Sequence, residues 1–135
     1  MTKILIIDDD LDFGDLTRRR LLRMGFDAKL HGGSSGVMDL LLRDEFALVI
    51  LDVNMPGLAG PDVMKMIRTL RTGQVKVMFY SSSDSHELRR LSEEHEADGY
   101  LTKTATMPEL DLRIRDVLQS RSAAAPRPAP AVRAR

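Results

Sequence analysis

The chain has 135 residues, of which 43% are hydrophobic, 30% are charged and none is cysteine. It is therefore long enough for one domain with a buried core, and disulfides and thiolate metal sites are excluded. No apolar stretch approaches the ~20 residues that span a bilayer. The N-terminus has no signal-peptide layout, so we expect a cytoplasmic protein that does not insert into membranes.

The formal net charge is zero, with 20 basic and 20 acidic residues. Four of the basic residues are arginines after residue 120, where no acid occurs. This leaves 16 basic against 20 acidic residues in residues 1–120, a net charge of −4. A mildly acidic domain is a poor candidate for direct binding of nucleic acid.

Segments that predict strands alternate with segments that predict helices. We expect strands, in chain order, over residues 3–7, 26–30, 47–51, 75–80 and 98–101. We expect helices to begin near Leu11, at Ser34 or Ser35 as a cap, at Pro61, at a cap formed by Asp84 or Ser85, and at Pro108. Gly25 and Gly73 are expected to end the first and third helices. Short apolar runs separated by helices are typical of parallel strands buried on both faces.

This alternation predicts an α/β fold, a doubly wound sheet of five parallel strands with five helices. From residue 121 the composition changes to Ala, Pro and Arg, which cannot bury enough apolar surface to fold. We therefore expect a domain over residues 1–120 and a disordered tail over residues 121–135, or alternatively the start of an interdomain linker there.

Polar residues follow the predicted strands at their carboxyl ends. Asp8 and Asp9 follow the first strand, Asp52 the third, Ser81 the fourth and Lys103 the fifth. If the strands are parallel, these ends converge on one edge of the sheet, which is where open α/β sheets bind ligands.

Crowded carboxylates raise one another's pKa unless a cation intervenes. Hard oxygen ligands without His or Cys suit Mg²⁺, which often bridges to phosphate oxygens, and a lysine supplies a point charge for an anion. Together these groups suggest phosphoryl chemistry, in which a carboxylate can also be the nucleophile.

The sequence strongly resembles the receiver domain of two-component response regulators, from residue 2 to about residue 120. The resemblance rests on ILIIDDD (residues 4–10), LDVNMPGLAG (51–60), Ser81 and GYLTK (99–103). These four elements occur in order, each at the end of a predicted strand, which makes the match specific. The resemblance implies a flavodoxin-like sheet with strand order 2-1-3-4-5.

The resemblance implies a role for each residue at this edge. Asp52 is in the position of the phosphoacceptor, Asp9 in that of a direct Mg²⁺ ligand, and Asp8 in that of an acid acting through a metal-bound water. The backbone carbonyl of Asn54 is in the place that completes the metal site. The side chain of Asn54, with Ser83, occupies a position that tunes dephosphorylation.

Three further residues carry roles in the same family. Lys103 is in the position of the lysine that pairs with a phosphoryl oxygen. Ser81 is in that of a hydroxyl that moves to the phosphoryl group, and Tyr100 in that of an aromatic that follows this movement inward.

The sequence departs from the family at Thr104, where a proline with a preceding cis peptide is usual. We therefore expect either a trans loop that aims Lys103 differently or a site that tolerates a strained cis peptide bond. The fourth helix is also unusually polar, with Ser-Glu-Glu-His-Glu at residues 92–96, so we expect its partner choice to differ.

We expect a single-domain, chemotaxis-regulator-like receiver that accepts a phosphoryl group from a histidine kinase or phosphotransfer protein. It is expected to be a monomer or weak dimer and no enzyme beyond its own phosphorylation and dephosphorylation. Its protein target is expected to bind the face of the fourth helix, fifth strand and fifth helix. One alternative is a docking module that works without phosphorylation, and another is the receiver of a larger regulator.

Overall fold

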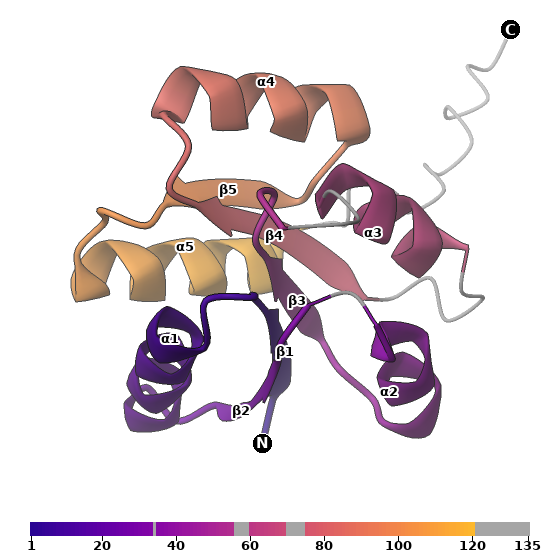
Figure 1. The fold of residues 1–135 in the computed structure, drawn as a ribbon. Coiled ribbons are helices and arrows are strands. Elements are labelled where there is room, and N and C mark those ends of the chain that lie inside the picture. Colours follow the sequence, from indigo (N-terminus) through magenta and orange to yellow (C-terminus); the bar gives the residue numbers. More distant parts are fainter. Residues whose placement is uncertain (34, 56–59, 70–74, 121–135) are drawn as a thin grey trace, which may run out of the picture.

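The computed structural model describes residues 1–33, 35–55, 60–69 and 75–120, so the predicted tail and Gly73 lie outside the described residues. Its strands are β1 (Lys3–Ile7), β2 (Asp27–His31), β3 (Leu48–Leu51), β4 (Lys76–Ser81) and β5 (Gly99–Thr102). They form one sheet in the order β2-β1-β3-β4-β5, and every neighbouring pair is parallel. The predicted fold class and strand order are therefore confirmed (Figure 1).

The strand bounds differ from the prediction by about one residue. Ser81 is the last residue of β4, not the residue after it, because it pairs with Thr102 in the ladder between β4 and β5. Strands β3 and β5 likewise begin one residue later than expected. These shifts leave the polar residues at the same edge of the sheet.

The described helices are α1 (Leu11–Arg23), α2 (Val37–Arg43), α3 (Gly60–Arg68), α4 (Ser85–His95) and α5 (Met107–Gln119). The side chain of Asp84 caps α4 as predicted, by accepting a hydrogen bond from the Glu87 amide. Pro108 lies in the first turn of α5. The predicted cap of α2 by Ser35 is wrong, since Gly36 holds the N-cap with φ of 83° and no side-chain hydrogen bond, and Ser34 lies outside the described residues.

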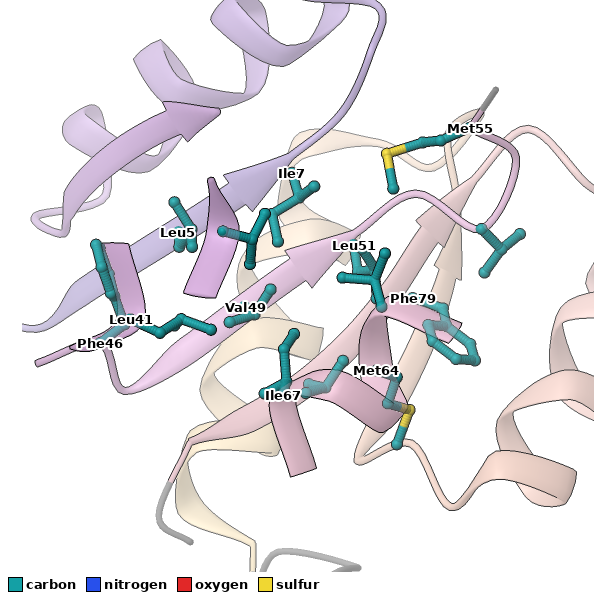
Figure 2. Packing of buried hydrophobic residues seen from close by; sticks show 14 of the residues in the cluster. Leu5, Ile7, Leu41, Phe46, Val49, Leu51, Met55, Met64, Ile67 and Phe79 are labelled. Carbon is teal, nitrogen blue, oxygen red and sulfur yellow. The ribbon is translucent and has the colours of Figure 1, made fainter. Parts of the chain in front are cut away.

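The helices cover the two faces of the sheet unequally, with α1 and α5 on one face and α2, α3 and α4 on the other (Figure 1). Alternate residues of the central strands serve the two faces: Phe79 packs on the α2–α4 side, whereas Met78 and Tyr80 pack on the α1–α5 side. Figure 2 shows the first of these cores, where Val49, Leu51 and Phe79 meet side chains of α2 and α3. The central strands are thus buried on both faces, which fixes their carboxyl ends.

Candidate functional site

Three carboxylates meet at the carboxyl edge of the sheet. Asp8 leaves β1 and Asp52 leaves β3, and each is almost fully buried, at 3% and 6% exposure. Asp9 is exposed. Oxygens of these three side chains lie within 4.8 Å of one another. The predicted convergence of the acids is therefore confirmed.

The backbone after each strand orients the two buried carboxylates. The amide of Asp10 donates a hydrogen bond to Asp8 Oδ1 at 2.9 Å, and the amide of Asn54 donates to Asp52 Oδ1 at 3.0 Å. Each bond occupies one oxygen of its carboxylate. The side chain of Asp10 points away from this group, since it caps α1 by accepting from the Phe13 amide at 3.1 Å.

Lys103 enters the carboxylate cluster from the end of β5. Its Nζ lies 2.9 Å from Asp8 Oδ2 and 3.2 Å from Asp52 Oδ2. None of the peptide bonds in the described part of the chain is cis, so the Lys103–Thr104 bond is trans. The loop is thus trans, as the first alternative expects, and Lys103 still reaches the Asp8 and Asp52 carboxylates; the cis bond of the second alternative is not observed. The Lys103 amide donates to the Ser81 carbonyl at 2.8 Å, which fixes the lysine backbone beside β4.

Burial and charge act against each other at this cluster. Burial raises the pKa of the Asp8 carboxyl, although the Lys103 ammonium and the Asp10 amide oppose the rise. Burial acts to lower the pKa of Lys103, but the Asp8 hydrogen bond and the charges of Asp52 and Asp8 outweigh it, so that this pKa is raised. The lysine therefore keeps its charge among the carboxylates.

A hydroxyl and an amide lie beside the carboxylates. The Asn54 side-chain amide donates to Ser81 Oγ at 3.0 Å and to Ser83 Oγ at 2.7 Å. Ser81 is fully buried, whereas Asn54 is exposed. The three residues assigned to hydroxyl movement and dephosphorylation are thus linked by hydrogen bonds, and their roles stay predictions.

Tyr100 is half-buried and packs against the core on the α2–α4 side. The Arg113 guanidinium lies 5.5 Å from its ring centroid and donates a hydrogen bond to its carbonyl. The ring therefore lies on the α2–α4 face of the sheet, opposite to the face of Tyr80, and the Arg113 side chain of α5 contacts it at the edge strand β5. Its movement as a switch is a prediction.

Two aromatic residues lie near Lys103 and are not among the site residues that the sequence predicts. The Lys103 Nζ lies 4.7 Å from the Phe13 ring centroid, and the Phe13 and Tyr80 centroids are 5.6 Å apart. The sequence predicts no site role for Phe13, which lies in the first expected helix, or for Tyr80, which ends the expected strand 75–80. The position of Phe13 in the first turn, three residues after Asp10, was the signal that places it at the same edge.

Buried carboxylates with a lysine among them, at the carboxyl edge of a doubly wound parallel sheet, define a protein of the flavodoxin-like α/β class with an acidic site that contains a lysine. The sequence model of the response regulator receiver domain matches residues 4–115. The chain belongs to the response regulator receiver domain family.

Curated relatives agree with this assignment. The chain is 33% identical over 119 residues to the sensory transduction protein RegX3 of Mycolicibacterium smegmatis, covering 88% of this chain and 51% of that protein. It is 36% identical over 119 residues to the transcriptional regulatory protein CpxR of Escherichia coli K12, covering 88% of this chain and 50% of that protein. The chain thus spans about half the length of these relatives.

Solved structures share the fold. The chemotaxis protein CheY4 of Vibrio cholerae superposes with a TM-score of 0.79 at 21% identity, covering 87% of this chain and 98% of that one. The response regulator TrrA of Thermotoga maritima, solved in complex with Mg²⁺-BeF, superposes with a TM-score of 0.76 at 26% identity, covering 87% and 99%. None of the helices in the described ranges is long and apolar enough to cross a membrane.

Proposed function

We propose that this receiver accepts a phosphoryl group on Asp52 from a histidine kinase or phosphotransfer protein, in a reaction that depends on Mg²⁺. The observation that carries the proposal is the placement of the Lys103 ammonium 3.2 Å from the Asp52 carboxylate, inside a group of acids at the carboxyl edge of the sheet. A lysine so placed neutralises charge on an anion that reaches Asp52.

The donor set fits a magnesium ion. Asp8, Asp9 and Asp52 offer carboxylate oxygens close to one another, with no His or Cys in the group, which suits a hard cation that keeps several waters. The Asn54 backbone carbonyl is the further oxygen proposed to complete the site. A relative of similar fold was solved with Mg²⁺-BeF, which supports the same chemistry here. Bound Mg²⁺ would supply positive charge to the transferring phosphoryl group.

The residues of this chain perform the transfer as follows. A carboxylate oxygen of Asp52 attacks the phosphorus of a phosphohistidine and forms a P–O bond. The P–N bond breaks, its electron pair stays on the imidazole nitrogen, and that ring takes a proton from water. Lys103 holds a phosphoryl oxygen, and catalysis consists of positioning and charge neutralisation.

The transferred group then biases the conformation of the domain. The Ser81 hydroxyl leaves Asn54 for a phosphoryl oxygen, and Tyr100 follows it inward, which alters the face formed by α4, β5 and α5. This is a population shift caused by a local change of charge. We propose that a protein target reads this face, that the chain is a monomer or weak dimer, and that it neither binds nucleic acid directly nor acts as an enzyme on other substrates.

Intact-mass spectrometry after incubation with acetyl phosphate and Mg²⁺ tests the proposal. We expect one added phosphoryl group on the wild type, and none on Asp52→Ala or when EDTA removes the metal. Asp12→Ala is the matched control, because Asp12 is an exposed acid in the first turn of α1, and it should label like the wild type. Full labelling of Asp52→Ala would refute the assignment of the acceptor. No labelling of the wild type with Mg²⁺ bound would favour the docking module that works without phosphorylation.

A further inference from the structure

We propose that Phe13 and Tyr80 form an aromatic seat that positions the Lys103 ammonium at the Asp8 and Asp52 carboxylates, and that they are positioning residues for phosphoryl transfer. The consequence for transfer rests on the proposed function, whereas the placement of the ammonium does not. The seat connects three separate elements: Phe13 comes from α1, Tyr80 from β4 and Lys103 from the end of β5.

The need for such a seat follows from the backbone after the lysine. Thr104 stands where the family usually has proline, and the peptide bond between Lys103 and Thr104 is trans. The turn is held by the hydrogen bond between the Thr102 and Thr104 hydroxyls at 2.9 Å and by the Lys103 amide on the Ser81 carbonyl. These contacts fix the lysine backbone, whereas its long, flexible side chain is held by the Asp8 and Asp52 carboxylates and by one further contact.

The Phe13 ring supplies that contact. The ammonium lies 4.7 Å from the ring centroid, within the distance at which the electron-rich face of an aromatic ring attracts a cation. The attraction is stronger where water is excluded, and the Lys103 side chain is only 12% exposed. Because the ring contact does not involve the carboxylates, we expect it to persist whichever charges they carry.

Tyr80 holds the Phe13 ring in place. Its ring lies 5.6 Å from that of Phe13 at an interplanar angle of 51°, a tilted arrangement that is favourable for aromatic pairs. Tyr80 is 2% exposed and belongs to the core on the α1–α5 side. The backbone of Phe13 is also fixed, since its amide donates to the Asp10 cap and its carbonyl accepts from the Thr17 hydroxyl.

The placement is tested by NMR on the Lys103 side chain, which needs no phosphorylation. Protons of a lysine over a ring face are shifted upfield by the ring current, so we expect upfield Cε protons for Lys103 in the wild type. Phe13→Leu should abolish this shift and Tyr80→Leu should reduce it. Phe13→Tyr and Tyr80→Phe keep both rings and should retain it. If Phe13→Leu does not fold, Tyr80→Leu still decides the outcome.

The consequence for transfer is tested by the rate of labelling with acetyl phosphate and by the affinity for Mg²⁺. We expect Phe13→Leu to label about tenfold more slowly, a factor between those of an exposed and a fully desolvated cation–π contact, while its Mg²⁺ affinity stays within about twofold of the wild type. A merely structural role would disturb the carboxylates and lower both. Rescue of the rate by Phe13→Tyr is expected.

Phe26→Leu is the matched control. Phe26 belongs to the same core as Tyr80. Its ring also contacts a cation, the Arg115 guanidinium at 5.1 Å from the ring centroid, but this contact does not involve Lys103. This variant should leave both the lysine shift and the labelling rate unchanged. A Lys103 shift that is absent in the wild type or survives in Phe13→Leu overturns the seat. A lost shift with an unchanged labelling rate overturns its role in transfer, and a wild type that shows the shift but never labels overturns the proposed function alone.

Discussion

Lys103 is the residue on which the electrostatics of the site depend. It contacts two buried carboxylates from different strands, Asp8 and Asp52, and an aromatic ring from α1. Each partner compensates for part of the water that the ammonium loses on burial. Removal of this one side chain would leave two buried acids near each other with no cation between them, so the lysine supports the fold of the edge as well as the proposed chemistry.

Asn54 offers a test of how the site admits water. Its side-chain amide donates to the hydroxyls of Ser81 and Ser83, and we expect it to block one approach of water to Asp52. We expect Asn54→Ala to open that approach and to speed loss of the phosphoryl group about fivefold, the factor equivalent to about 1 kcal/mol of hydrogen-bonded contact. Intact-mass spectra after removal of acetyl phosphate give the rate.

Asp12→Ala is the control for that prediction. Asp12 is an exposed acid in the first turn of α1 and takes no part in the hydrogen bonds of Asn54 with Ser81 and Ser83, so its rate should stay near that of the wild type. Equal rates for Asn54→Ala and the wild type would show that this side chain does not govern the access of water.

The acids and the lysine could be predicted from sequence because each directly follows an apolar run, and parallel strands bring such positions together. The seat could not, because it depends on packing between distant elements. The position of Phe13 in the first turn of α1 indicates the edge of the sheet but not a contact with Lys103, and only the folded sheet places Tyr80 beside it. The direction of the Lys103 side chain could not be predicted either, because the identity of the residue that follows it does not determine that direction.

At the scale of the elements, α4 ends at a non-glycine residue with left-handed backbone. Glu96 has φ of 56° and ψ of 45° at the C-cap, a conformation that L-residues other than glycine adopt at a cost. We expect Glu96→Gly to raise the free energy of unfolding by about 0.5–1 kcal/mol, after allowance for the greater freedom of glycine in the unfolded chain. Urea unfolding followed by circular dichroism measures the change.

The same substitution inside the helix should have the opposite sign. Glu94 lies within α4 and pairs with Arg90 at 3.0 Å, so Glu94→Gly is expected to lower the free energy of unfolding by about 1 kcal/mol. If Glu96→Gly also destabilises the protein, the left-handed cap is not strained.

The existence and type of the described elements could be predicted from short apolar runs for the strands and from cap and end signals for the helices, whereas the exact bounds could not. A strand ends at the last residue that pairs with a neighbouring strand. For β4 this residue is Ser81, which pairs with Thr102 in β5. The start of α2 depends on the left-handed backbone of Gly36. Because the loop contains three glycines, several of its residues could form the N-cap of α2. The predicted serine cap rests on residue propensity and not on backbone geometry.

At the scale of the whole molecule, the geometry of the site depends on the packing of both cores. The carboxylates, the lysine and the aromatic seat come from β1, β3, β4, α1 and the end of β5, so their spacing requires the complete sheet. Strands buried on both faces give these ends little freedom. A substitution in the central strands β1, β3 or β4 is therefore expected to reach the site through strand position and not through direct contact.

At alkaline pH, ionisation of Tyr80 in the α1–α5 core is expected to affect the stability of the whole domain. Burial raises the pKa of its hydroxyl in the folded state, although the charges of Arg20 and Lys103 oppose the rise. The unfolded phenol ionises near pH 10, so the stability of the folded state is complete below that pH and is lost as the pH rises above it. Tyr80→Phe removes this dependence, and its free energy of unfolding should fall less steeply than that of the wild type between about pH 9 and pH 11.

Urea unfolding of both proteins across that range measures the two slopes. Near pH 7 the variant should be no less stable than the wild type, because the Tyr80 hydroxyl is buried without a hydrogen-bond partner within the described residues, and removal of an unsatisfied buried hydroxyl carries no penalty. Ring packing against Phe13 is kept, so the aromatic seat stays intact. Equal slopes would mean that the phenol ionises as easily in the folded core as in water. A loss of about 1 kcal/mol or more at pH 7 would mean that the hydroxyl has a partner in the folded protein, such as Arg20 or water.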